Sequence, residues 1–158
     1  VYARTNWAGK IDLILLTDAI GSDYIFGRIH YPSDEDGNTS LEVDLTGQCA
    51  SESIGSRQYS GSGGGFCYTR GTYFAEHGTG LLCFQSRTKK GMPKIKATLT
   101  PGAVVTHQRN YIQYVVTENG IADLRGTTVR ERAKMLINLA HPDDREELTR
   151  AAKELYYF

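Results

Sequence analysis

The stretch Tyr111-Ile112-Gln113-Tyr114-Val115-Val116-Thr117 has the strongest strand character in the chain, because aromatic and β-branched residues favour extended backbone. Residues 80–84 form a compact apolar run that fits a fully buried strand. Residues 41–45 alternate apolar and acidic side chains, which predicts a half-buried strand. Residues 24–31 and 95–99 are weaker extended segments, and residues 11–16 fit either a buried strand or a short helix.

Helical patterns lie between and after these strands. Residues 68–76 predict a short helix, and Thr128 and Glu131 form the Thr-x-x-Glu capping box that opens a longer one. A second C-terminal helix begins at residues 141–144, where a proline and two acids occupy the first turn. Strands that alternate with helices predict an α/β fold, with a largely parallel sheet flanked by helices. The apolar face of the longer helix consists of Val129, Ala133, Leu136, Ile137 and Ala140.

The charge balance excludes proteins that bind through a basic surface. Lys and Arg number 18 and Asp and Glu number 18, so the net charge is zero, whereas nucleic-acid and membrane-surface binders carry a basic excess. No apolar run approaches the roughly 18–20 residues that span a bilayer. We therefore expect no nucleic-acid partner and no membrane partner, and a single domain from 158 residues.

Cysteine and histidine usage suggests a reducing compartment and no metal site. The three cysteines, Cys49, Cys67 and Cys83, are odd in number and widely spaced, which suits the cytoplasm better than a disulfide framework. The four histidines lie far apart, and no CxxC or HxxxH pair suggests metal ligands. Cys83 lies in an apolar run and is predicted to be inert, whereas Cys67, next to a glycine run, stays open as a nucleophile. Because the chain starts without Met or a secretory signal, we expect a processed piece or an expressed fragment.

A run of glycine and serine, Ser60-Gly61-Ser62-Gly63-Gly64-Gly65, is the first candidate binding element. Glycine lets a ligand approach the main chain, whose N–H groups can then face an anion or an oxyanion. The Lys89-Lys90-Gly91 turn could add positive charge to the same place. A plain connection stays the alternative, because neither the Walker nor the Rossmann spacing is present. The predicted ligand is phosphorylated and carbonyl-bearing, and the predicted binding residues are Gly61, Gly63, Gly64, Gly65, Lys89, Lys90 and Gly91.

The turn at residues 118–120 follows the strongest strand and begins with Glu118. A glutamate at the end of a parallel strand could act as a nucleophile or a general base. We favour the other reading, a loop glutamate that accepts hydrogen bonds from backbone amides. Arg125, Arg130 and Arg132 could bind anions, but a salt-bridged, solvated surface is the favoured interpretation.

Several motifs follow one another in an order that is more specific than any one of them. They are residues 41–48, 53–55, 58–64, 99–106, 114–118, 120–126, 130–133 and 140–142. In this order they resemble the C-terminal domain of the acetyl-CoA hydrolase / 4-hydroxybutyrate CoA-transferase family. The resemblance covers residues 41–148. It implies a CoA-transferase-like C-terminal domain over residues 41–158, after a poorly matched N-terminal segment and polar loop over residues 1–40.

The resemblance implies a fold of the NagB/RpiA/CoA-transferase type, in enzymes with two related α/β domains and an active site between them. In such enzymes a glutamate attacks the acyl-CoA and forms an acyl anhydride, then a glutamyl-CoA thioester. The acyl acceptor is a carboxylate in transferases and water in hydrolases. That glutamate belongs to the N-terminal domain, which is absent here, so the catalytic residue is expected upstream and this chain alone is expected to be inactive. The aromatic end, residues 156–158, is predicted to be exposed and to pack on that partner domain.

The resemblance also implies what this domain contributes, namely binding of CoA and of the acyl group. Gly63 and Gly64 match the family's glycine loop, and residues 89–91 fall in a second loop, where a backbone amide is expected near the thioester oxygen. The expected substrates are an acyl-CoA of the acetyl, butyryl or 4-hydroxybutyryl class and a small carboxylate, with no tightly bound cofactor. The expected partners are the N-terminal domain of the same enzyme and, at full length, further copies in a homo-oligomer.

The chain departs from the family pattern at three places. Residues 65–67 read Gly-Phe-Cys where relatives carry Gln-x-Asp, the second loop is one residue shorter, with Met92 and Pro93 inside it, and Asn119 replaces the usual tyrosine. The departures at Gly65 and Cys67 favour a second hypothesis, a degenerate module that binds CoA or a protein without catalysis, whereas the helical signature and the glycine loop favour the enzyme. A third possibility is an unrelated α/β ligand-binding domain.

Overall fold

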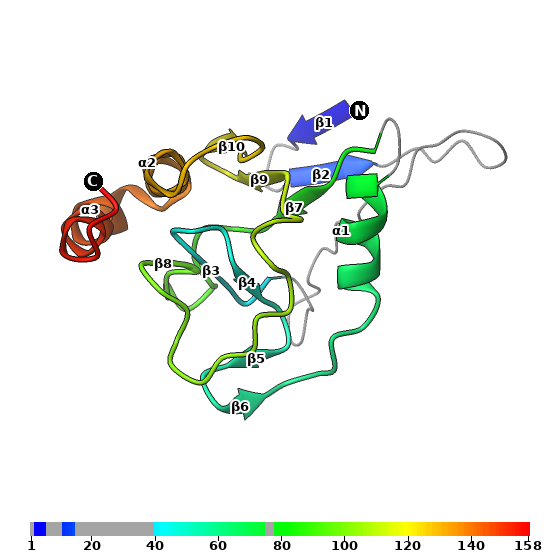
Figure 1. Cartoon of the computed structure of the whole chain (residues 1–158), viewed down its shortest axis with the longest axis horizontal. Helices are drawn as coiled ribbons and strands as arrows, with labels where there is room; N and C mark the ends of the chain where they lie inside the picture. The colour runs from blue at the N-terminus through cyan, green and yellow to red at the C-terminus, as the bar shows by residue number, and fades with distance from the viewer. Residues whose placement is uncertain (1, 6–10, 15–39, 75–77) are drawn as a thin grey trace, which may run out of the picture.

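Within the described residues, the elements are short strands, one 3₁₀ turn and three α-helices of ten or eleven residues. The computed structural model describes residues 2–5, 11–14, 40–74 and 78–158, and Figure 1 shows how the elements are arranged. The helices are α1 (Gly65–Phe74), α2 (Val129–Leu139) and α3 (Arg145–Glu154), with a 3₁₀ turn, η1 (Pro142–Asp144), before α3. The strands are β1 (Tyr2–Thr5), β2 (Ile11–Ile14), β3 (Glu42–Asp44), β4 (Cys49–Ala50), β5 (Ser53–Ile54), β6 (Arg57–Gln58), β7 (Leu81–Cys83), β8 (Ile95–Lys96), β9 (Tyr114–Thr117) and β10 (Gly120–Asp123).

The sheets are small and mixed, which corrects the prediction of a largely parallel sheet. The described strands pair as β10-β9-β7, β4-β3-β8, β5-β6 and β1-β2. Only the β7–β9 and β3–β8 pairs among them are parallel, and the other four pairs are antiparallel. The physical reason is that these strands have two to four residues, and tight turns return the chain beside itself. Gly120, at φ 145°, forms such a turn and brings β10 back along β9.

The predicted helices are present, with small shifts of their ends. The helix expected at residues 68–76 begins three residues earlier, at Gly65. The capping box of α2 is formed as predicted: the Glu131 N–H donates to Thr128 Oγ1 at 3.3 Å, and the Thr128 N–H donates to Glu131 Oε2 at 2.7 Å. Of the uncertain segment at residues 11–16, the described part is a strand. The strand expected at residues 24–31 lies outside the described residues.

Two acidic residues of β3 are buried, although the alternating pattern predicts that they face solvent. The Glu42 carboxylate accepts the Thr100 N–H and Oγ1–H at 2.8 Å each, and it pairs with Lys96 Nζ at 2.6 Å. Asp44 accepts hydrogen bonds from the N–H groups of Thr46 and Gln48. Because each buried oxygen gains donors, burial does not carry its usual penalty. The prediction of a half-buried strand was therefore wrong.

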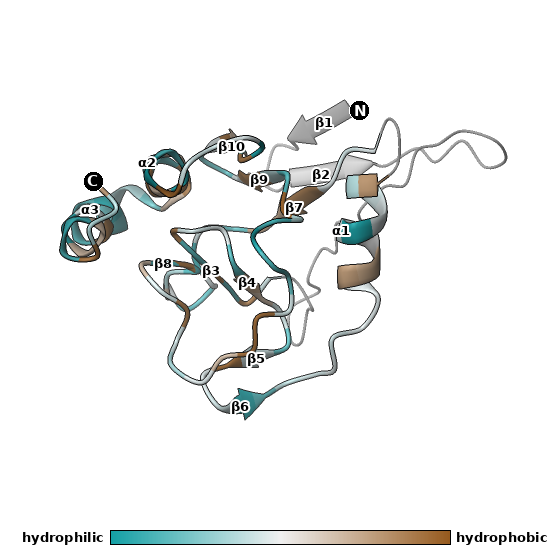
Figure 2. Ribbon diagram, in the orientation of Figure 1, coloured by the Kyte–Doolittle hydropathy of each residue, from teal (hydrophilic) through white to brown (hydrophobic). Residues whose placement is uncertain are grey.

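One hydrophobic core joins the strands to the C-terminal helices. Figure 2 shows apolar residues along β7 and β9. Tyr157 and Phe158 pack partly against this core, so the prediction of a wholly exposed aromatic end was wrong for them, whereas Tyr156 is 93% exposed. None of the helices in the described ranges is long and apolar enough to cross a membrane. The fully buried side chains include Val43, Leu45, Val115, Leu124, Ala133 and Leu136.

Candidate functional site

The glycine segment, residues 60–65, connects β6 to the first turn of α1 (Figure 1). Residues 61–64 are exposed. A side chain at Gly61 or Gly63 would meet no other atom within 4 Å, and Gly63 has φ +56°, in the left-handed region that favours glycine. The main chain of this segment is therefore open to close approach by a ligand.

Gly65 differs from Gly61 and Gly63 because it packs against another side chain, that of His107. A Cβ atom at this position would lie 2.9 Å from Cε1 and 3.1 Å from Nε2 of His107. His107 is itself 5% exposed. Gly65 therefore brings the start of α1 close to a buried imidazole, a structural role that the sequence pattern does not reveal.

Residues 88–92 form a tight turn on the connection between β7 and β8. The Gly91 N–H donates to the Thr88 carbonyl at 2.8 Å, and the Thr88 N–H donates to the Met92 carbonyl at 2.8 Å. Gly91 has φ +79°, which this turn requires. Lys89, Lys90 and Gly91 are exposed, as a binding loop requires. The Gly91 amide, however, is already engaged within the turn.

The two predicted binding segments lie on different connections. Figure 1 shows the glycine segment between β6 and α1, whereas the β7–β8 connection runs toward β8 on the other side of the picture. Both segments are exposed, so neither encloses a ligand by itself.

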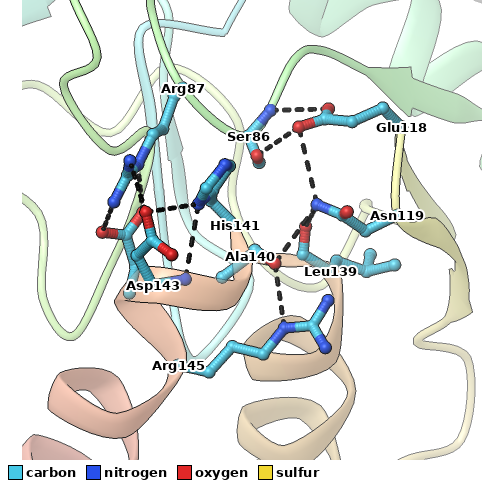
Figure 3. A network of polar contacts seen from close by, with 10 residues as sticks. Ser86, Arg87, Glu118, Asn119, Leu139, Ala140, His141, Asp143 and Arg145 are labelled. Atoms are coloured by element: carbon cyan, nitrogen blue, oxygen red, sulfur yellow. Dashed lines mark hydrogen bonds and ion pairs between the residues drawn. The ribbon is translucent and has the colours of Figure 1, made fainter. Parts of the chain in front are cut away.

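Glu118 is held by Ser86, which follows β7. The Ser86 N–H donates to Glu118 Oε2 at 2.9 Å, and the Ser86 hydroxyl donates to Oε1 (Figure 3). Ser86 is 1% exposed, while the Glu118 side chain lies at the surface. This geometry matches the favoured reading of a loop glutamate that binds a backbone amide. Both carboxylate oxygens are engaged, which weakens the case for a nucleophile.

Asn119 ties the same turn to the end of α2. Its Nδ2 donates to the carbonyls of Leu139 at 3.1 Å and Ala140 at 3.2 Å (Figure 3). Arg145 Nε donates to the Ala140 carbonyl at 3.0 Å. These donors satisfy carbonyls that a helix end leaves without intrahelical partners. The turn after β9 therefore positions the C-terminal helices.

Arg87 makes a second link to these helices, which sequence reasoning missed. Its guanidinium meets Asp144 through two hydrogen bonds, Nε–Oδ2 at 2.9 Å and Nη2–Oδ1 at 2.6 Å, and it contacts Asp143 at 3.2 Å. The hydrogen bonds to Asp144 raise the pKa of Arg87 further. No local pattern indicates a pair of residues so far apart along the chain.

The three arginines near α2 have different surroundings. Arg125 pairs with Asp123 at 2.7 Å on the surface and lowers the pKa of that carboxyl to about 2, which confirms the predicted salt bridge. Arg130 is exposed. Arg132 instead donates to the carbonyls of Thr46, Arg109 and Leu124, so the prediction of a solvated ion pair was wrong for it.

The cysteines divide by burial. Burial raises the pKa of the Cys49 and Cys83 thiols to about 12 in each case, so Cys83 is the inert core residue that the sequence predicts. Cys67 is exposed on α1, beside the glycine segment. Across the part of the chain that the structure describes, no group of three or more His, Cys, Asp or Glu side chains could hold a metal ion.

Comparisons with known proteins agree with one another. A family described as the acetyl-CoA hydrolase/transferase C-terminal domain matches residues 37–152. The succinyl-CoA:cyclohexane-1-carboxylate CoA transferase of Geobacter metallireducens is 52% identical over 119 residues, which are 75% of this chain and 27% of that protein. The 4-hydroxybutyrate coenzyme A transferase of Clostridium kluyveri is 44% identical over 120 residues, 75% of this chain and 28% of that protein.

The chain is also similar to solved structures. The crystal structure of RipA from Yersinia pestis is 40% identical in sequence and superposes with a TM-score of 0.70, over 77% of this chain and 27% of that chain. The present chain thus spans little more than a quarter of the length of the relatives that it matches.

Proposed function

The chain belongs to the acetyl-CoA hydrolase/transferase family, whose C-terminal domain it carries, and we propose that it supplies the CoA- and acyl-binding half of an acyl-CoA:carboxylate CoA-transferase. The substrates are an acyl-CoA of the acetyl, butyryl or 4-hydroxybutyryl class and a small carboxylate. Hydrolysis, with water as the acceptor, is the variant reaction that the family's description includes. We assign the domain to residues 41–158 and expect the whole enzyme to be a cytoplasmic homo-oligomer.

The observation that carries this proposal is the exposed glycine segment at the start of α1. Its open main chain and the positive end of the α1 dipole suit an anionic group such as a CoA phosphate or a developing thioester oxyanion. Lys89 and Lys90 are exposed on the second loop and add positive charge for the phosphates. Gly61, Gly63 and Gly64 line the proposed site, and Gly65 sets its position against the core.

The nucleophile of the reaction is expected in the N-terminal domain of the same enzyme. The engagement of Glu118 by Ser86 supports this division of labour. In the full enzyme that domain would cover the two exposed loops and exclude water from the thioester, which strengthens electrostatic stabilisation there. The isolated chain is accordingly expected to bind CoA without turning it over.

The test is calorimetric titration of the chain with CoA. We expect Gly64→Val to weaken the affinity about tenfold or more, because a branched side chain would occupy the space of the ligand. Its fold should persist, since Gly64 is exposed. Thr98→Val, an exposed change outside both loops, is the control and should leave the affinity unchanged. Equal affinity of Gly64→Val and the wild type would contradict the proposal.

A second candidate is a degenerate module that binds CoA or a protein without catalysis. One observation favours it: Gly65 and Cys67 stand where the family resemblance implies glutamine and aspartate. Discovery of an upstream coding region with a suitable glutamate would favour the enzyme. Intact-mass spectrometry after incubation with acetyl-CoA adds a further check. A hydroxylamine-labile adduct of CoA mass would place a nucleophilic carboxylate within this chain and make Glu118 the leading candidate.

A further inference from the structure

His107 connects the glycine segment to the β-structure of the core. Its backbone forms a bridge with Cys49 of β4: the Cys49 N–H donates to the His107 carbonyl at 3.1 Å, and the His107 N–H donates to the Cys49 carbonyl at 3.0 Å. The residue is 5% exposed. The main chain of His107 is therefore fixed to β4, and its side chain is buried.

The ring of His107 contacts the first turn of α1 at two points. Nδ1 lies 3.3 Å from Thr69 Oγ1, and this hydroxyl also reaches the Phe66 carbonyl at 3.0 Å. The Cε1 edge of the ring faces Gly65, where a Cβ would approach to 2.9 Å. A larger side chain at position 107, or a displaced His107 ring, would push against Gly65 and so move the start of α1.

The surroundings of His107 favour the neutral imidazole. Burial lowers its pKa from the ordinary value of 6.5, and the carboxylate of Glu52 opposes this shift. Among the described residues, Glu52 is the charged group that acts on the ring, and its negative charge raises the pKa of His107. The nearby N-terminus of α1 also disfavours a positive charge, because it is the positive end of the helix dipole.

We propose that His107 is the positioning residue of the glycine segment: its ring fixes the first turn of α1 and, through it, the exposed backbone of residues 61–64. As a statement about ligand binding, this rests on the proposed function. Protonation of the ring adds a positive charge to a buried site beside the positive end of the α1 dipole. Acidification therefore loosens the segment, and only the fraction of molecules with a fixed segment binds CoA at full strength.

The first test needs no ligand. We would follow the amide resonances of residues 61–64 and the His107 ring resonances of the full chain by NMR from pH 8 to pH 5. We expect these amide shifts to follow the titration of His107. The dependence should vanish in His107→Gln and persist in His141→Gln, where the replaced histidine caps η1. Should His107→Gln fail to fold, Thr69→Val serves, because it breaks the contact while His107 still titrates.

The second test measures CoA affinity at pH 7.5 and at pH 5.5. CoA carries a phosphate that titrates near pH 6, so His107→Gln measures the part of the change that belongs to the ligand. We expect the wild type to lose at least about threefold more affinity than His107→Gln over this interval.

The outcomes separate the two proposals. If the amide shifts of residues 61–64 do not change with the titration of His107, the positioning role is overturned, whether or not CoA binds. Equal losses of affinity in the wild type and in His107→Gln would also overturn it as a determinant of binding. If the amide shifts of residues 61–64 follow the His107 titration but the chain binds no CoA at any pH, the positioning role is supported and the proposed function is contradicted.

Discussion

Single residues decide how the two proposed binding loops are held. Gly63 and Gly91 adopt positive φ angles with open space beside them, so their role is conformational. Gly65 has ordinary backbone angles and a crowded neighbourhood, so its role is steric. The same residue type thus serves two purposes within one glycine segment, and the sequence alone does not distinguish them.

Gly65→Ala is expected to destabilise the protein by about 1–2 kcal/mol. Crowding of a packed site costs typically about 1–3 kcal/mol, which exceeds the roughly 0.5–1 kcal/mol that alanine gains over glycine in a helix. The matched control is Gly61→Ala, where the new methyl group meets no atom within 4 Å. Urea unfolding followed by circular dichroism measures both. A penalty for Gly65→Ala that survives in a His107→Ala background would contradict the steric explanation.

Thiol labelling should separate the three cysteines. At pH 8, iodoacetamide is expected to modify Cys67 in the folded chain, because it is exposed. Cys49 and Cys83 should react only on unfolding, since burial raises both pKa values to about 12 and the thiolate is the reactive form. Peptide mass spectrometry identifies the labelled residue. Rapid labelling of Cys83 under native conditions would contradict the assignment of this residue to the core.

At the scale of elements, local patterns predict the helices well and the ends of strands less well. The Thr128–Glu131 capping box sets the start of α2, because its hydrogen bonds join residues three apart. The burial of Glu42 was missed because its partner Thr100 lies far along the chain. Asp44 is instead satisfied by the nearby Thr46 and Gln48, a turn that the alternating pattern does not indicate. Strand β10 was missed because its pattern is short and follows a turn.

The link between Arg87 and Asp144 is expected to hold the C-terminal helices on the core. Asp144→Ala should cost about 1.5–3 kcal/mol, because two charge-assisted hydrogen bonds are lost at a site where the Asp144 side chain is 15% exposed. Asp143→Ala removes contacts with Arg87 and His141 from a side chain that is 68% exposed and should cost less than about 1 kcal/mol. Both substitutions remove an acid near the start of α3, so dipole effects largely cancel in the comparison. Equal losses in urea unfolding would contradict this assignment.

At the scale of the whole molecule, the order of motifs identified the family, while the sheet arrangement was predicted incorrectly. Motifs such as residues 120–126 lie within the matched range 37–152. The order of motifs along the sequence can be recognised without knowing which strands pair. Parallel and antiparallel pairing depends on where each turn returns the chain, and strands of two to four residues leave little periodicity from which to infer it. The contact between His107 and α1 could not be predicted either, because Thr69 and His107 lie 38 residues apart in the sequence.

The proposed division of the enzyme into two parts would explain why both proposed binding loops are exposed. A chain that spans 27–28% of its relatives' length need not enclose its ligand. The glycine segment and residues 89–91 would each present one part of a site that the N-terminal domain completes. CoA should accordingly bind this chain more weakly than it binds the whole enzyme.

The most direct test of the account is to map CoA binding on the chain residue by residue. Amide NMR spectra would be recorded while CoA is added to saturation at pH 7.5. We expect shifts concentrated in residues 61–64 and 89–91, with smaller changes at the first turn of α1. Saturable shifts confined to other surfaces, or no shift at millimolar CoA, would contradict the claim that these loops form the CoA-binding half of the enzyme.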